Sequence, residues 1–152
     1  MGVPLMWTPA VLVLMGLAFF ASSYPAGALS DRTSRGGVLA VGLVLLLAAD
    51  LVLATADSYW GLGAGLVLWG LHMGFTQGLL AALVADTATT ELRGTAFGMF
   101  NLLTGLALLI ASVLAGLLWD VIGHQGTFYA GAGFAAAALA GLALLRRRGI
   151  LR

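Results

Sequence analysis

Five polar residues lie inside apolar stretches of this sequence, where they could contact a solute or a proton. Trp69, His72 and Thr76 are spaced at i, i+3 and i+7, so on a helix they share one face, and Gln77 lies beside it. Asn101 lies in the following apolar stretch. An imidazole exchanges protons near physiological pH, whereas hydroxyl, amide and indole groups only form hydrogen bonds. His72 is therefore a candidate proton carrier, or alternatively a neutral histidine that forms a hydrogen bond.

A second group of polar residues is charged. The segment GALSDRTSRG, residues 27–36, places Asp31, Arg32 and Arg35 within five positions, between two apolar stretches. Asp86 and Arg93 flank a similar polar segment later in the chain. Such charges can fix the orientation of a membrane protein, or they can form ion pairs where helices end. The sequence leaves both interpretations open.

Other kinds of site lack the residues that they need. The chain has no cysteine, and its two histidines, His72 and His124, have no acid at metal-ligand spacing. No catalytic triad context, phosphate-binding glycine loop or long basic tract is present. We therefore expect neither an enzyme nor a metal, cofactor or nucleic-acid site.

The composition identifies the kind of fold that must position these residues. Of the 152 residues, 61% are hydrophobic and only 9% are charged, and the mean hydropathy is +1.06. A soluble domain carries about a quarter charged residues. The sequence thus predicts an all-α integral membrane protein, with residues 1–152 forming a single transmembrane helical domain in contact with the lipid bilayer.

Five stretches are long enough to cross the hydrocarbon core as helices. They span residues 5–28, 37–56, 60–86, 95–119 and 127–146. No basic residue precedes the first stretch, so we expect it to be a retained span and not a cleaved signal peptide. Asp50 is the acid within the second span, and we expect it to pair with a neighbouring helix or to reach the outer interface; the alternative is a role in proton coupling.

The arginines predict how the spans are oriented. With five antiparallel spans, all seven arginines fall on one side of the membrane, which predicts an outer N-terminus and a cytoplasmic C-terminus. Trp7, Trp60 and Trp119 fall at the outer ends, where amphipathic rings are favoured. Glycines recur at helical spacing in residues 60–86 and 95–119, which indicates close helix packing.

The charged loop resembles the loop signature of the major facilitator superfamily (MFS). Gly27, Asp31, Arg32 and Arg35 match that signature, whereas Ser34 replaces a glycine in it. Residues 69–120 look like helices ten and eleven of bacterial members, and the segment from Asp86 through Arg93 to Gly98 is the most specific part. The resemblance implies that the five spans correspond to helices eight to twelve of a twelve-helix fold.

The same resemblance implies functions for the candidate residues. It implies a cytoplasmic charge network that includes Asp31, Arg35 and Asp86, and a substrate cavity lined by the first, third and fourth spans. We therefore expect part of a secondary transporter of an unknown small molecule in a bacterial cytoplasmic membrane. Such a five-helix fragment would lack the N-terminal half and would be inactive alone. The alternative is a small non-catalytic membrane protein that binds or modulates a partner.

Overall fold

The computed structural model describes residues 5–148, and it confirms the predicted fold class. The five helices are each long and apolar enough to cross a membrane. The elements are the 3-10 turn η1 (Leu5–Trp7), α1 (Thr8–Arg32), α2 (Arg35–Ala54), α3 (Tyr59–Thr87), the 3-10 turn η2 (Thr90–Leu92), α4 (Arg93–Ile122) and α5 (His124–Arg147).

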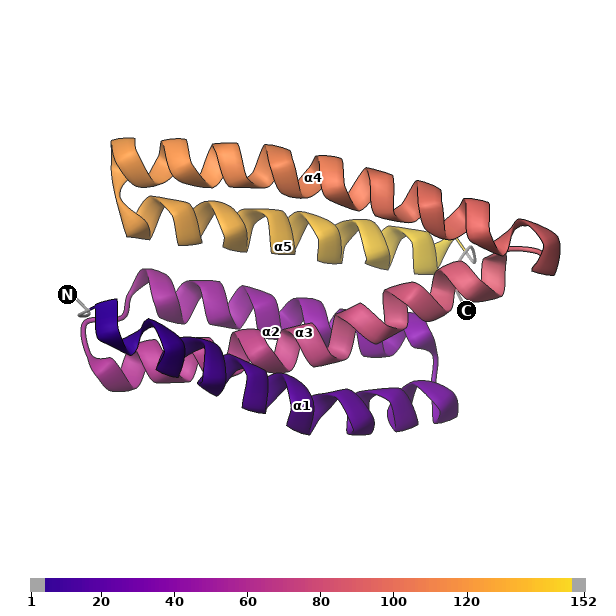
Figure 1. Ribbon diagram of the computed structural model, residues 1–152, viewed down its shortest axis with the longest axis horizontal. Coiled ribbons are helices and arrows are strands. Elements are labelled where there is room, and N and C mark those ends of the chain that lie inside the picture. The colour runs from indigo at the N-terminus through magenta and orange to yellow at the C-terminus, as the bar shows by residue number, and fades with distance from the viewer. Residues whose placement is uncertain (1–4, 149–152) are drawn as a thin grey trace.

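Helices that are consecutive in the chain run antiparallel, but neighbours in space are not always neighbours in sequence (Figure 1). Helix α3 packs along both α1 and α2, and α2 also packs along α5. Helix α4 lies at one edge of the bundle, where it contacts α5 and the end of α3 (Figure 1). Thus α1 and α4 lie on opposite sides of the bundle.

Most connections are shorter than the sequence predicts. The polar residues Ser30 to Arg32 complete α1, so that only Thr33 and Ser34 separate it from α2. Helices can extend beyond the hydrocarbon core because polar side chains at their ends reach water and lipid headgroups. Gly123 alone separates α4 from α5; its φ of 92° is a conformation that favours glycine.

The described arginines all lie at one end of the bundle. The α1–α2 link, the α3–α4 link and the end of α5 lie at the same end of the bundle (Figure 1). Six arginines belong to these segments: Arg32, Arg35, Arg93, Arg146, Arg147 and Arg148. The seventh, Arg152, lies outside the described residues. We call this end of the bundle the arginine end.

Small residues let the first three helices approach closely. A Cβ atom at Gly70 would lie 2.5 Å from the backbone oxygen of Met15 and 2.7 Å from Cβ of Ala18. A Cβ at Gly42 of α2 would lie 2.6 Å from Cγ2 of Thr76. These helices therefore meet almost backbone to backbone, as expected where dispersion forces and not the hydrophobic effect drive association.

Helix α4 differs from the others because none of its residues is buried. A Cβ atom added to its glycines at positions 94, 98, 105 and 116 would meet no neighbouring atom within 4 Å. Because lipid tails and partner helices are both apolar, an exposed apolar helix of this kind is compatible with a membrane environment. Within residues 5–148, however, no other helix packs against the glycines of α4.

Candidate functional site

A groove at the arginine end brings together several residues of the charged loop. Its volume is about 310 Å³, and it lies between α1 and α3, next to the first residue of α2. We call it the α1–α3 groove. Gly27 and Asp31 line it from α1, and Arg35 lines it from α2.

The groove exists because both of its walls carry small side chains. Ser22, Ala26 and Ser30 follow one another at intervals of four residues, and all three are buried on the face of α1 that meets α3. Gly74 and Gly78 contribute to the opposite wall. Our sequence reasoning missed these serines, although their helical spacing was a signal that could have revealed the face.

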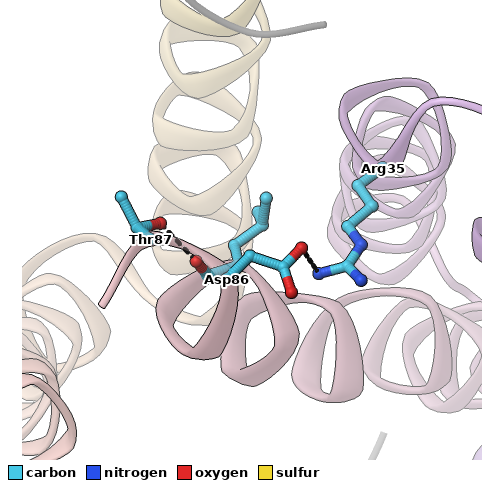
Figure 2. Close-up of polar contacts among 4 residues, drawn as sticks. Arg35, Asp86 and Thr87 are labelled. Atoms are coloured by element: carbon cyan, nitrogen blue, oxygen red, sulfur yellow. Dashed lines mark hydrogen bonds and ion pairs between the residues drawn. The ribbon is translucent and has the colours of Figure 1, made fainter. Parts of the chain in front are cut away.

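Arg35, which lines the groove, also forms an ion pair. The guanidinium of Arg35, at the start of α2, contacts the carboxylate of Asp86 near the end of α3 (Figure 2). The neighbouring Thr87 donates a hydrogen bond from its hydroxyl to the backbone oxygen of Leu83, which keeps its side chain on its own helix. Arg35 and Asp86, two of the three residues expected to form a charge network, thus lie in direct contact.

This ion pair is partly accessible to solvent, although Nη1 of Arg35, the atom that contacts Asp86, is itself buried. The side chain of Arg35 is 30% exposed and that of Asp86 is 59% exposed. Water and salt weaken the attraction between such groups, so exposed pairs contribute at most about 1 kcal/mol. The pair can therefore define how α2 and α3 meet without locking them together.

The other charged candidate residues, Asp31, Arg32 and Arg93, are exposed, and in the described part of the chain none of them forms an ion pair. Arg146 makes a contact that the sequence did not predict, since its Nη2 lies 3.4 Å from Oγ of Ser34. This contact joins the end of α5 to the residue that caps α2.

Three of the five intramembrane candidates face other helices. The ring of Trp69 meets Phe128 of α5 edge-on, with 6.3 Å between ring centroids. Nδ1 of His72 lies 2.8 Å from the backbone oxygen of Gly42 in α2. A carbonyl oxygen only accepts hydrogen bonds, so Nδ1 carries the proton and donates it. Thr76 is 6% exposed and packs on the same glycine.

The remaining two candidates lie on open surface. Gln77 of α3 and Asn101 of α4 are both exposed. The structure therefore does not bring the five residues into one site: three contribute to helix packing and two are accessible on separate helices. Among residues 5–148, no three histidine or acidic side chains lie close enough together to hold a metal ion.

Comparison with known proteins shows what the whole chain is similar to. Residues 5–150 match the family model described as Major Facilitator Superfamily. An uncharacterized MFS-type transporter of Methanocaldococcus jannaschii is 32% identical over 136 residues, which are 90% of this chain and 33% of that protein. No solved structure matches the chain.

Two relatives from Escherichia coli have more specific names. The inner membrane transport protein YajR is 29% identical over 116 residues, which cover 76% of this chain and 25% of YajR. The class C tetracycline resistance protein is 33% identical over 135 residues, which cover 89% of this chain and 32% of that protein. The chain thus spans between a quarter and a third of the length of these relatives.

Proposed function

Because the chain belongs to the Major Facilitator Superfamily, we propose that it forms one wall of a secondary transporter for a small molecule. The family match over residues 5–150 is the observation that carries this proposal. In transporters of this kind, two helical bundles rock around a central site and expose it to each side of the membrane in turn. The relative named for tetracycline resistance and a citrate exporter of Aspergillus niger, 27% identical over 103 residues, support a small organic molecule as the substrate class.

We further propose that other transmembrane helices complete the transporter. Helix α4 has no buried residue, and its polar and glycine positions, including Asn101, are open. The curated relatives are three to four times as long as the stretch that this chain matches in them. Helices that pack on α4 would supply the wall that this bundle lacks, with Gln77 and Asn101 facing the space between.

The orientation belongs to the same proposal. Basic residues are enriched on the cytoplasmic side of membrane proteins, so we place the arginine end in the cytoplasm and the opposite end outside. A bacterial cytoplasmic membrane suits this arrangement. The α1–α3 groove and the Arg35–Asp86 pair then lie at the cytoplasmic mouth of the transporter.

In this position, the charged residues have distinct roles. Arg35 and Asp86 connect α2 to α3, and both helices belong to the same bundle, so the pair would move with that bundle as it rocks. Asp31 is exposed at the groove and forms no ion pair within residues 5–148. We propose that Asp31 contacts a helix of the opposite wall in the state that is closed to the cytoplasm.

The exposed α4 also favours the alternative function. A small membrane protein that regulates a partner would use the same open helix as its binding surface. The DNA before the Met1 codon distinguishes the two functions. A further run of about seven spans, in frame or shifted by a frameshift, supports the transporter; a promoter and ribosome-binding site directly before Met1 support the small regulatory protein.

Transport itself can be tested in proteoliposomes. The chain would be joined to its complementary helices, and the flux of radiolabelled tetracycline or citrate across the vesicle membrane would be measured. We expect flux with at least one of these probes and a reduced flux in Asp86→Asn. Glu91→Gln is the matched control, because Glu91 is an exposed acid at the same end without an ion pair among the described residues. Equal flux in both variants would contradict a role for the pair.

A further inference from the structure

Asp50 is a carboxylate buried between two apolar helices. It lies one turn before the end of α2 at Ala54, and only 4% of its surface is exposed. Its side chain lies against α5, where a Cβ atom at Gly131 would come within 2.7 Å of Oδ2 and 3.1 Å of Cγ. The absence of a side chain at position 131 therefore makes the room that this carboxyl group occupies.

Nothing in the surrounding helices balances a negative charge at this position. Within residues 5–148, no hydrogen bond and no ion pair joins the carboxylate of Asp50 to another group. The titratable or charged residues of the three helices that contact α2 are Tyr24, Asp31 and Arg32 on α1, Tyr59, His72 and Asp86 on α3, and His124, Tyr129, Arg146 and Arg147 on α5.

The basic groups of these helices lie elsewhere: Arg32, Arg146 and Arg147 are at the arginine end, where α2 begins, and Asp50 is near the opposite end of α2 (Figure 1). Arg35, the charged residue that shares α2 with Asp50, is fifteen positions away, or about 22 Å along a helix. The imidazole of His72 is bound to Gly42, eight positions before Asp50. His124 begins α5, seven positions before Gly131, which places it about 10 Å away along that helix.

An ionised carboxylate in such surroundings is far less favourable than a neutral one. Transfer of an isolated charge into an apolar medium is costly unless the charge is paired. Lipid, which is also apolar, surrounds the part of the α2–α5 interface that the protein does not cover. A neutral carboxyl group carries a much smaller penalty and fits the space beside Gly131. The geometry therefore favours the protonated acid.

We propose that Asp50 is a proton-binding site and that its neutral carboxyl group allows α2 and α5 to pack together. The reaction is the reversible addition of one proton to one carboxylate oxygen. The packed interface binds this proton more tightly than separated helices would, so the interface is most stable at low pH and weakens as the pH rises. This inference does not depend on the proposed transport function.

Infrared spectroscopy of the purified chain in lipid nanodiscs tests proton binding directly. At neutral pH we expect the carbonyl band of a protonated carboxylic acid, and we expect this band to disappear under alkaline conditions. The band should be absent from Asp50→Asn and unchanged in Asp57→Asn, a matched acid in the exposed α2–α3 link. A wild-type spectrum at neutral pH that contains only ionised carboxylates would overturn the proposal.

Stability measurements test the consequence for packing. The thermal midpoint of the wild-type chain should fall as the solution becomes alkaline, whereas that of Asp50→Asn should stay level, because asparagine is neutral and similar in shape. If Asp50→Asn loses the same stability as the wild type, another group causes the loss and Asp50 does not control the interface. If Asp50→Asn does not fold, the infrared titration of the wild-type chain decides between the protonated and ionised forms.

Discussion

Helices α3 and α4 both carry rows of glycine, but only glycines of α3 are buried. Gly65, Gly70 and Gly74 lie where α3 meets α1 and α2, and each would clash with a neighbour if it carried a Cβ atom. The glycines of α4 face open space. The same pattern of small residues thus forms a helix interface in one case and an open surface in the other.

The difference teaches that a row of small residues permits close packing but does not choose a partner. Helix α3 lies between α1 and α2, and its buried glycines meet backbone, leucine and serine atoms of these neighbours. Helix α4 lies at the edge of the bundle and contacts only α5 and part of α3 among the major helices. Substitutions in the two regions can test this contrast, beginning with the largest expected effect.

The substitution Gly70→Ala should destabilise the chain strongly. The new methyl group would press on the backbone oxygen of Met15, which cannot move without moving α1. Overpacking of this kind typically costs about 1–3 kcal/mol. Unfolding of the detergent-solubilised chain by a denaturing detergent would measure the loss. Gly105→Ala on α4 is the control and should cost nothing; equal losses in both variants would show that both glycine rows are packed.

Replacement of His72 by phenylalanine should have a moderate effect. It removes the hydrogen bond from Nδ1 to the backbone oxygen of Gly42 and with it a polar link between α3 and α2. A buried hydrogen bond contributes about 1 kcal/mol, and interhelical bonds in membranes average about 0.6 kcal/mol. The same unfolding assay applies, with Gln77→Leu as an exposed neighbour that should change little. A stable His72→Phe variant with altered pH dependence of transport would instead favour a proton-carrying role.

The pair of Arg35 and Asp86 should contribute a small coupling energy. A double-mutant cycle with Arg35→Gln and Asp86→Asn should give about 0.5 kcal/mol, because more than half of the Asp86 side chain is exposed. The coupling should shrink at high salt, as expected for charges accessible to water. A parallel cycle with Arg93→Gln should give no coupling. A salt-independent value well above 1 kcal/mol would show that the pair is shielded from solvent.

Substitutions on α4 should have the smallest effect on the chain alone. Asn101→Leu should change stability by less than about 0.5 kcal/mol, since the Asn101 side chain is exposed. Accessibility within the membrane can be measured by spin-label relaxation with oxygen, which dissolves in lipid; a label on Asn101→Cys should be accessible and one on Thr76→Cys should be protected. Equal protection of both positions would mean that α4 is covered, for example by a second copy of the chain.

The sequence predicted the architecture well because membrane insertion depends on local composition. Long apolar stretches must become helices in lipid, where no water satisfies the backbone. The five predicted spans therefore correspond to α1 through α5, and the ends differ by only a few residues. The differences occur where polar residues such as Ser30 to Arg32 continue a helix beyond the hydrocarbon core.

The candidate site was harder to predict because it depends on which helix faces which. The spacing of Trp69, His72 and Thr76 indicates one shared face, but it does not say whether that face meets solvent or another helix. In the structure it meets α2 and α5. The buried serines of α1 have helical spacing in the sequence, but only the structure shows that Ser22 packs against Gly74 of α3.

The sequence by itself determined that this chain crosses a membrane, how many helices cross it, and that every described arginine lies at one end. These properties follow from the composition of short segments and from the alternation of antiparallel spans. Only the tertiary structure decided that Arg35 meets Asp86, that Asp50 is buried against Gly131, and that α4 is open. These contacts join residues that are tens of positions apart, and they arise from how helix surfaces of similar composition fit together, which local sequence does not encode.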